Sequence, residues 1–140
     1  MKWITREGAR VDRVACPWLI KRFIDPSAQF LFVPTDVVLR AAREEKAVAF
    51  DTRGAELDHR DGKCTFEVML DKYHLSDPSL KRLGRIVHGA DIPEEITITQ
   101  ESAGLKAFAD GLHNICKDDQ RKLEISFPLY DALYDYCKYS

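Results

Sequence analysis

The sequence predicts an α+β domain, in which a small N-terminal mixed sheet packs with a predominantly α-helical C-terminal half. Strand-like apolar runs occur only in the first half of the chain. After them, apolar residues recur at the three- and four-residue spacing of helices almost to the C-terminus. No internal repeat, low-complexity tract or Gly/Ser linker divides the 140 residues, so we expect a single domain over residues 1–140.

Three strands and two helices are expected in the first half. In chain order, these elements cover residues 2–6, 17–24, 30–33, 36–45 and 47–51. Pro34 ends the second strand. Proline favours the first turn of a helix and disfavours helical backbone in the residue before it. Pro17 therefore predicts a helix that begins at or near it, with Cys16 at the helix N-terminus.

Helices are expected throughout the second half. Their ranges are residues 65–73, 78–91, 100–117 and 118–136. In the second of them Asp77 is the expected N-cap and Pro78 occupies the first turn. Asp118 and Asp119 read as a capping pair for the last helix.

The charge balance and the cysteines exclude several classes of protein. The chain has 21 Lys+Arg against 23 Asp+Glu, a net charge of -2, which disfavours a nucleic-acid-binding module. The N-terminus lacks the pattern of a signal peptide, and no uncharged run approaches the roughly 20 residues of a membrane span. Four scattered cysteines form no CxxC pair. We therefore expect a cytoplasmic protein with reduced thiols.

The first group of candidate functional residues is Arg13, Cys16, Trp18 and Arg22. The partial positive charge at a helix N-terminus favours the thiolate form of a cysteine, which makes Cys16 a candidate catalytic nucleophile. Trp18 and Arg22 are four residues apart and share a helix face, where cation–π packing is possible or Arg22 and Arg13 could clamp an oxyanion. The alternative is that Trp18 is simply half-buried, that Cys16 is a small hydrophobic residue, and that both arginines are surface partners of Asp12 and Asp25.

The second group is a polar loop that is dense in metal-ligand types. Glu56, His59, Cys64 and Glu67 lie within it. His59 with one or two of the others could supply ligands of a nitrogen/oxygen or nitrogen/sulfur site. The loop cannot complete a site alone. Glu67 or Glu56 could instead carry protons in a metal-dependent reaction, and Glu67 is thus a second catalytic candidate.

A His-x-x-Asp pair in a later helix is the expected complement of this loop. His88 and Asp91 are three residues apart and lie on neighbouring positions of one helical turn, at the border of the apolar stripe. Carboxylate-rich histidine sites suit Zn, Mn or Fe. The alternative is an ordinary solvated pair or a helix-end contact. The metal prediction requires His59 and His88 to point into one shared cavity.

Several of these runs together resemble a known family. Residues 12–20 read Asp-Arg-Val-Ala-Cys-Pro-Trp-Leu-Ile and are the most specific part; residues 2–6, 50–51, 59, 64–66, 86–91 and 130–134 also take part. The chain resembles, over nearly its whole length, the ChrB C-terminal domain family of chromate resistance proteins. That resemblance implies a link to chromate efflux and an ability to sense, bind or chemically handle a metal ion or an oxyanion.

The sequence thus leaves several functions open. The first is a cytoplasmic metal-binding domain associated with chromate resistance or chromate sensing. A metal-dependent redox or hydrolytic enzyme and an oxyanion-binding domain are the alternatives, and a purely structural or regulatory partner domain is a further class. Longer members of the family carry an N-terminal region linked to regulation, and because this chain starts at the domain itself, direct nucleic-acid binding is not expected of it.

Overall fold

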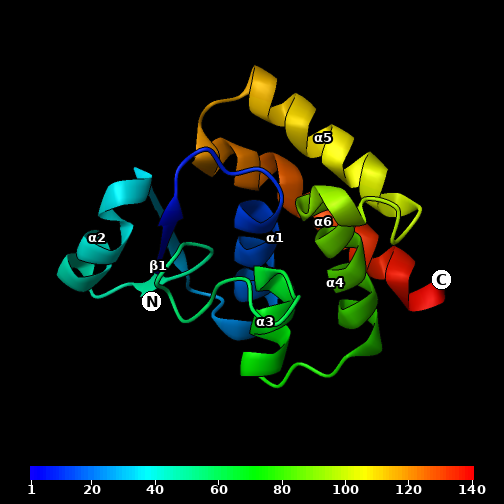
Figure 1. Cartoon of the computed structure of the whole chain (residues 1–140), viewed down its shortest axis with the longest axis horizontal. Helices are drawn as coiled ribbons and strands as arrows, with labels where there is room; N and C mark the ends of the chain where they lie inside the picture. Colours follow the sequence, from blue (N-terminus) through cyan, green and yellow to red (C-terminus); the bar gives the residue numbers. More distant parts are fainter.

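The computed structural model describes all residues, 1–140, and confirms the α+β class. A three-stranded sheet of order β2-β1-β3 lies near the N-terminus, and helices form the rest (Figure 1). The strands are β1 (Lys2–Arg6), β2 (Gln29–Val33) and β3 (Val48–Ala49). Both pairings are parallel, so the sheet is not mixed as expected. The reason is that a helix joins each strand to the next and returns the chain to the same end of the sheet.

The helices follow the sequence prediction closely in the second half. They are α1 (Asp12–Leu19), α2 (Val38–Glu45), α3 (Thr65–Lys72), α4 (Pro78–Asp91), α5 (Glu101–Ile115) and α6 (Asp119–Tyr139). Short turns of other helix types cover Ile20–Ile24 (π) and Thr35–Val37 and Pro93–Glu95 (3₁₀).

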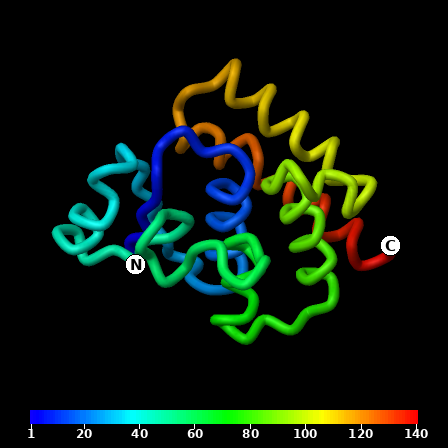
Figure 2. The backbone as a smooth tube through the Cα atoms, viewed as in Figure 1, coloured from blue at the N-terminus to red at the C-terminus, as the bar shows by residue number.

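Helices cover both faces of the sheet. Successive side chains of a strand point to opposite faces. Trp3 accordingly belongs to the main core with α1, α3, α4 and α6, whereas Ile4 packs on Val38 and Ala42 of α2. The backbone trace in Figure 2 shows α2 set to one side of the sheet and the other helices gathered on the far side. The N-terminal part is thus a βαβαβ unit joined to a helical bundle.

The start of α1 differs from the prediction. The helix begins at Asp12, and Pro17 lies inside it, so Cys16 is not at the helix N-terminus. Proline has no N–H to donate, which leaves the carbonyl of Arg13 without its usual helical partner. The chain then widens into the π turn, where the Asp25 N–H donates to the Ile20 carbonyl at 2.7 Å. The preference of proline for the first turn therefore does not set the start of α1, whose residues before Pro17 are mostly buried.

Two of the predicted helix caps are confirmed. The Asp77 carboxylate accepts from the Ser79 N–H at 2.8 Å, and the Asp118 carboxylate accepts from the N–H groups of Gln120 and Arg121. Each satisfies N–H groups that the first helical turn leaves free.

Asp119 has a different role from its neighbour Asp118. Its carboxylate accepts from the N–H groups of Gly8 at 2.9 Å and Ala9 at 2.8 Å. The ammonium of Lys122, which is 1% exposed, donates to Asp119 at 3.2 Å, to the Ala9 carbonyl at 2.9 Å and to His113 Nδ1 at 2.8 Å. This buried ion pair fixes the loop between β1 and α1 on the start of α6.

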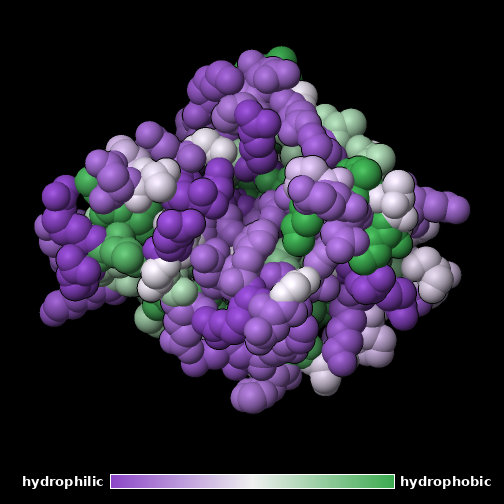
Figure 3. Space-filling model, viewed as in Figure 1, coloured by the Kyte–Doolittle hydropathy of each residue, from purple (hydrophilic) through white to green (hydrophobic).

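The surface of the domain is mixed in character. Hydrophilic side chains cover most of the face in Figure 3, with smaller hydrophobic patches between them. None of the helices combines the length and the apolar character that crossing a lipid bilayer requires.

We expect the Lys122→Met substitution to lower the free energy of unfolding by about 3–5 kcal/mol, because it leaves the buried Asp119 carboxylate without its cation. The free energy is measured by denaturant titration. The matched control is Lys117→Met at an exposed position that makes no ion pair, where a change within about 0.5 kcal/mol is expected. Equal effects of the two substitutions would contradict this account of the loop anchor.

Candidate metal centre

The candidate centre lies at the carboxyl ends of the parallel strands. Arg6 is the last residue of β1, Asp51 follows β3, and Asp12 begins the helix after β1. The chain leaves β1 and β2 for helices on opposite faces of the sheet, which opens a crevice at this end. Charged side chains from distant parts of the sequence meet there.

Asp12 is the most buried carboxylate of this region, at 1% exposure. Its oxygens accept from the N–H groups of Thr65 at 2.9 Å and Phe66 at 3.3 Å, which are the first turn of α3. The Cys16 thiol donates to it at 3.8 Å. Burial raises the pKa of Asp12 to about 7, the charge of Asp91 adds to the rise, and a hydrogen bond with His59 opposes it.

His59 lies among three carboxylates. Its Nε2 is 3.0 Å from Asp91 Oδ2, 3.2 Å from Asp12 Oδ2 and 3.4 Å from Asp51 Oδ1. Hydrogen bonds to Asp12, Asp51 and Asp91 raise the pKa of His59 to about 12, although partial burial acts in the other direction. Asp12, His59 and Asp91 offer donor atoms that lie within 4.8 Å of one another, and we call them the carboxylate set.

Asp51 is held by its own partners beside this set. The Thr65 hydroxyl donates to Asp51 at 2.6 Å, and Arg6 and Arg13 contact its second oxygen at 3.3 and 3.4 Å. Burial alone would raise the pKa of Asp51, but hydrogen bonds from His59 and Thr65 and the charge of Arg13 outweigh it, so the pKa is lowered. Its negative charge is therefore already compensated within the chain.

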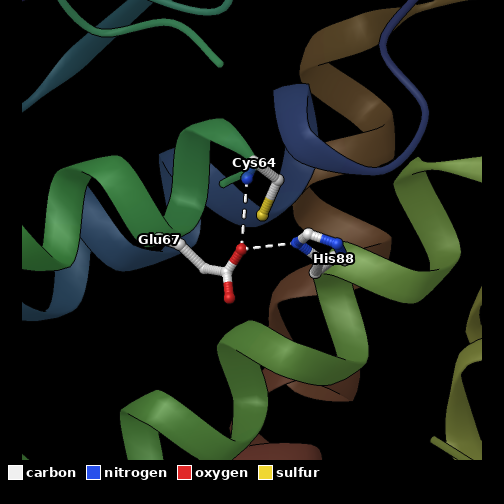
Figure 4. Close-up of side chains that lie close together, drawn as sticks. All are labelled: Cys64, Glu67 and His88. Atoms are coloured by element: carbon white, nitrogen blue, oxygen red, sulfur yellow. Dashed lines mark hydrogen bonds and ion pairs between the residues drawn. The ribbon is translucent and has the colours of Figure 1, made fainter. Parts of the chain in front are cut away.

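A second group lies between α3 and α4 and is shown in Figure 4. Glu67 Oε1 accepts from the Cys64 N–H at 3.1 Å and is 2.6 Å from His88 Nδ1. The donor atoms of Cys64, Glu67 and His88 lie within 4.8 Å of one another, and we call these residues the thiol set. Cys64 is the N-cap residue of α3 and is fully buried, and this burial raises the pKa of its thiol.

The structure brings five of the six predicted metal ligands into these two neighbouring sets: His59, His88, Asp91, Glu67 and Cys64. His59 and His88 both line a polar hollow of about 340 Å³. They belong to different sets, however, so the single site expected of His59, His88 and Asp91 is divided in two. Glu56 lies apart from both sets. Its carboxylate is exposed and pairs with Lys72, the last residue of α3, at 2.6 Å.

The predicted oxyanion group is not assembled into a clamp. Trp18 and Arg22 do share a helix face, but both donate to Asp131: Trp18 at 2.7 Å, and Arg22 through two bonds of 3.0 Å. Arg13 instead donates to Asp51 and to the Gly8 carbonyl. The two guanidinium groups thus bind different carboxylates, that of Asp51 for Arg13 and that of Asp131 for Arg22.

Two further expectations about this segment are corrected. Trp18 is buried and packs on Phe66, and the cation–π contact of Arg22 is with Phe127, whose ring centroid is 5.4 Å away. Cys16 is fully buried inside α1, and burial together with the charge of Asp12 raises the pKa of its thiol well above the usual value. The thiolate form expected of Cys16 at a helix N-terminus is therefore disfavoured.

Sequence reasoning missed Asp12 and Asp51 as members of the centre. Asp51 comes two residues after β3, and Asp12 begins the helix that follows β1. Acids placed after the carboxyl ends of parallel strands meet at one edge of the sheet. This reasoning requires the strands to be recognised as parallel in the sequence. The strand β3 has only two residues and does not indicate its direction. Asp12 was assigned only to a surface pairing with arginine.

Comparison with known proteins agrees with the sequence resemblance. The family model described as "ChrB, C-terminal domain" matches residues 3–137. A curated relative, "Protein ChrB" of Cupriavidus metallidurans, is 37% identical over 134 residues. The match covers 95% of this chain and 40% of the relative, so the chain spans less than half of that protein's length. No solved structure matches the chain.

We expect Cys116 to be the cysteine that iodoacetamide modifies first in the native protein, because it is partly exposed whereas Cys16, Cys64 and Cys137 are buried. Peptide mass spectrometry measures modification against time. The Cys116→Ser variant should lose the fast phase, and unfolding in denaturant should release the other three thiols. Fast modification of Cys16 in the folded protein would contradict its placement inside α1.

Proposed function

The chain belongs to the ChrB C-terminal domain family, and on that premise we propose that it is a cytoplasmic metal-binding domain that takes part in chromate resistance or chromate sensing. The observation that carries this proposal is the thiol set: a thiol, a carboxylate and an imidazole with donor atoms within 4.8 Å of one another in the interior. Since the curated relative is longer, the role of the domain in such a protein is part of the proposal.

The chemistry of the donors supports a transition metal. Thiolate and imidazole together select Zn or Fe over the oxygen-preferring Mg and Ca. The Cys64 sulfur faces the backbone N–H of Glu67 in the capping box of α3, and the Glu67 carboxylate is in contact with the ring of His88. Glu67 orients that imidazole and is itself fixed by the Cys64 N–H at the start of α3. A bound divalent ion would hold Cys64 as thiolate and supply a Lewis acid.

We expect the His88→Asn variant to bind Zn²⁺ at least tenfold more weakly than the wild type at this site, because it loses a ligand. Elemental analysis of protein purified without chelator, together with calorimetric titration of Zn²⁺, measures the loss. His74→Asn is the matched control, since His74 belongs to neither donor set. Unchanged Zn²⁺ content and affinity in the His88→Asn protein would exclude the thiol set as a metal site.

A second candidate function is oxyanion binding at a different place from the one expected. Lys81 and Arg85 are four residues apart on α4 and form no ion pair within the chain, unlike Arg13 and Arg22. They line a hollow of about 310 Å³. The hollow also contains Glu67, so it adjoins the thiol set. Two unpaired cations favour a doubly charged oxyanion such as chromate, and Arg85 can hold it through two bonds.

We expect the Arg85→Gln variant to bind chromate and sulfate about tenfold more weakly than the wild type, since one charge-assisted contact is worth about 1.5 kcal/mol or more. Calorimetric titration with each anion measures this. Lys117→Gln, at an exposed cation elsewhere, should leave binding unchanged, and so should Arg22→Gln. If Arg22→Gln weakened anion binding and Arg85→Gln had no effect, the anion site would lie beside Arg22 and not beside Arg85.

A further inference from the structure

The donor sets are separate, and this separation determines how many ions they can hold. Ligands of one first-row metal ion lie about 2.0–2.3 Å from it, so two donors of the same ion are at most about 4.6 Å apart. The donor atoms lie within 4.8 Å of one another, close to this limit, inside the carboxylate set and inside the thiol set, and the two sets share no residue. His59 contacts Asp91, and His88 contacts Glu67. Neither group of three close donors contains both imidazoles, so the arrangement favours a separate ion for each set.

The sets are nevertheless neighbours, because α4 contributes one residue to each of them. His88 and Asp91 are one turn apart on α4, and each belongs to a different set. Cys64 is followed by Thr65, whose N–H is bound by Asp12 of the other set. His59 and His88 line the same hollow, where the imidazole of His59 is partly exposed and that of His88 is buried. Figure 4 shows Cys64 and Glu67 at α3 turned toward His88 on α4.

Each set has the same charge composition. The thiol set offers a thiolate, a carboxylate and one imidazole, and the carboxylate set offers two carboxylates and one imidazole. Asp12 and Asp91 have no cationic partner except His59, whereas Asp51 is compensated by Arg6 and Arg13. A single imidazolium cannot neutralise two carboxylates. Two anionic ligands and one neutral imidazole neutralise one divalent ion.

We propose that the chain binds two divalent metal ions of different preference, one in each set, with Asp12 as a ligand of the second. The thiol set takes Zn²⁺ or a similar thiolate-binding ion. The carboxylate set, with two oxygens and one nitrogen, takes an oxygen-preferring ion such as Mn²⁺. This inference rests on the proposed metal-binding function and extends it from one ion to two.

Titration of the metal-free protein with Co²⁺ tests the proposal, because thiolate ligation to Co²⁺ gives a charge-transfer absorption that oxygen and nitrogen ligands do not give. We expect two equivalents of Co²⁺ per chain, of which one develops the thiolate band. Cys64→Ser should lose the band and keep one equivalent. Asp91→Asn should keep the band and lose the other equivalent.

Two further variants make the result independent of folding. Asp12→Asn changes the acceptor of two buried N–H groups at the start of α3 and can prevent folding. Asp91 forms its ion pair with His59, so Asp91→Asn and His59→Gln decide the outcome in that case. His74→Gln is the control and should keep both equivalents.

The outcomes separate this inference from the function on which it rests. A single equivalent that is lost in both Cys64→Ser and Asp91→Asn would show one shared ion and overturn the two-ion proposal. A single equivalent that Asp91→Asn and His59→Gln leave intact would also overturn it, while the thiol set remained a metal site. Absence of any bound Co²⁺ would overturn the proposed metal-binding function itself.

Discussion

The buried carboxylate of Asp12 is the contact on which the site depends. It lies at the first residue of α1 and binds the N–H groups of Thr65 and Phe66, and it thereby fixes where α3 begins. The position of Cys64 and of Glu67, one turn later, follows from that start. Buried N–H groups left without an acceptor would cost about 1–3 kcal/mol each, so this contact also stabilises the junction of α1 with α3.

Charge compensation inside the domain explains which residues stay free to bind ligands. Arg13, which lies in the most specific sequence motif, pairs with the buried carboxylate of Asp51, and Arg22 pairs with the exposed carboxylate of Asp131. A guanidinium that already binds a carboxylate through two bonds gains little from exchanging it for another anion. Lys81 and Arg85 face a hollow on α4 without such partners. The candidate ligand sites therefore gather around α3 and α4 and not around α1.

Local signals in the sequence predicted most of the helices and part of the site. The helix from Pro78 to Asp91 was predicted with its cap and its apolar stripe, because both depend on residues within a few positions of one another. The meeting of His59 with Asp91 was also anticipated. The start of α1 was not, since a single proline preference was weaker than the packing of the segment before it.

The sequence by itself determined the class of fold, the helices with their caps, and which residues are of metal-ligand type. Only the tertiary structure decided how those ligands are divided, and it added Asp12, a residue that the pattern assigned to the surface. The physical reason is that helix periodicity is set by neighbours in the chain. The pairing of an imidazole with a carboxylate is set by the parallel strands and the packing of α3 on α4, which bring together residues far apart in the sequence.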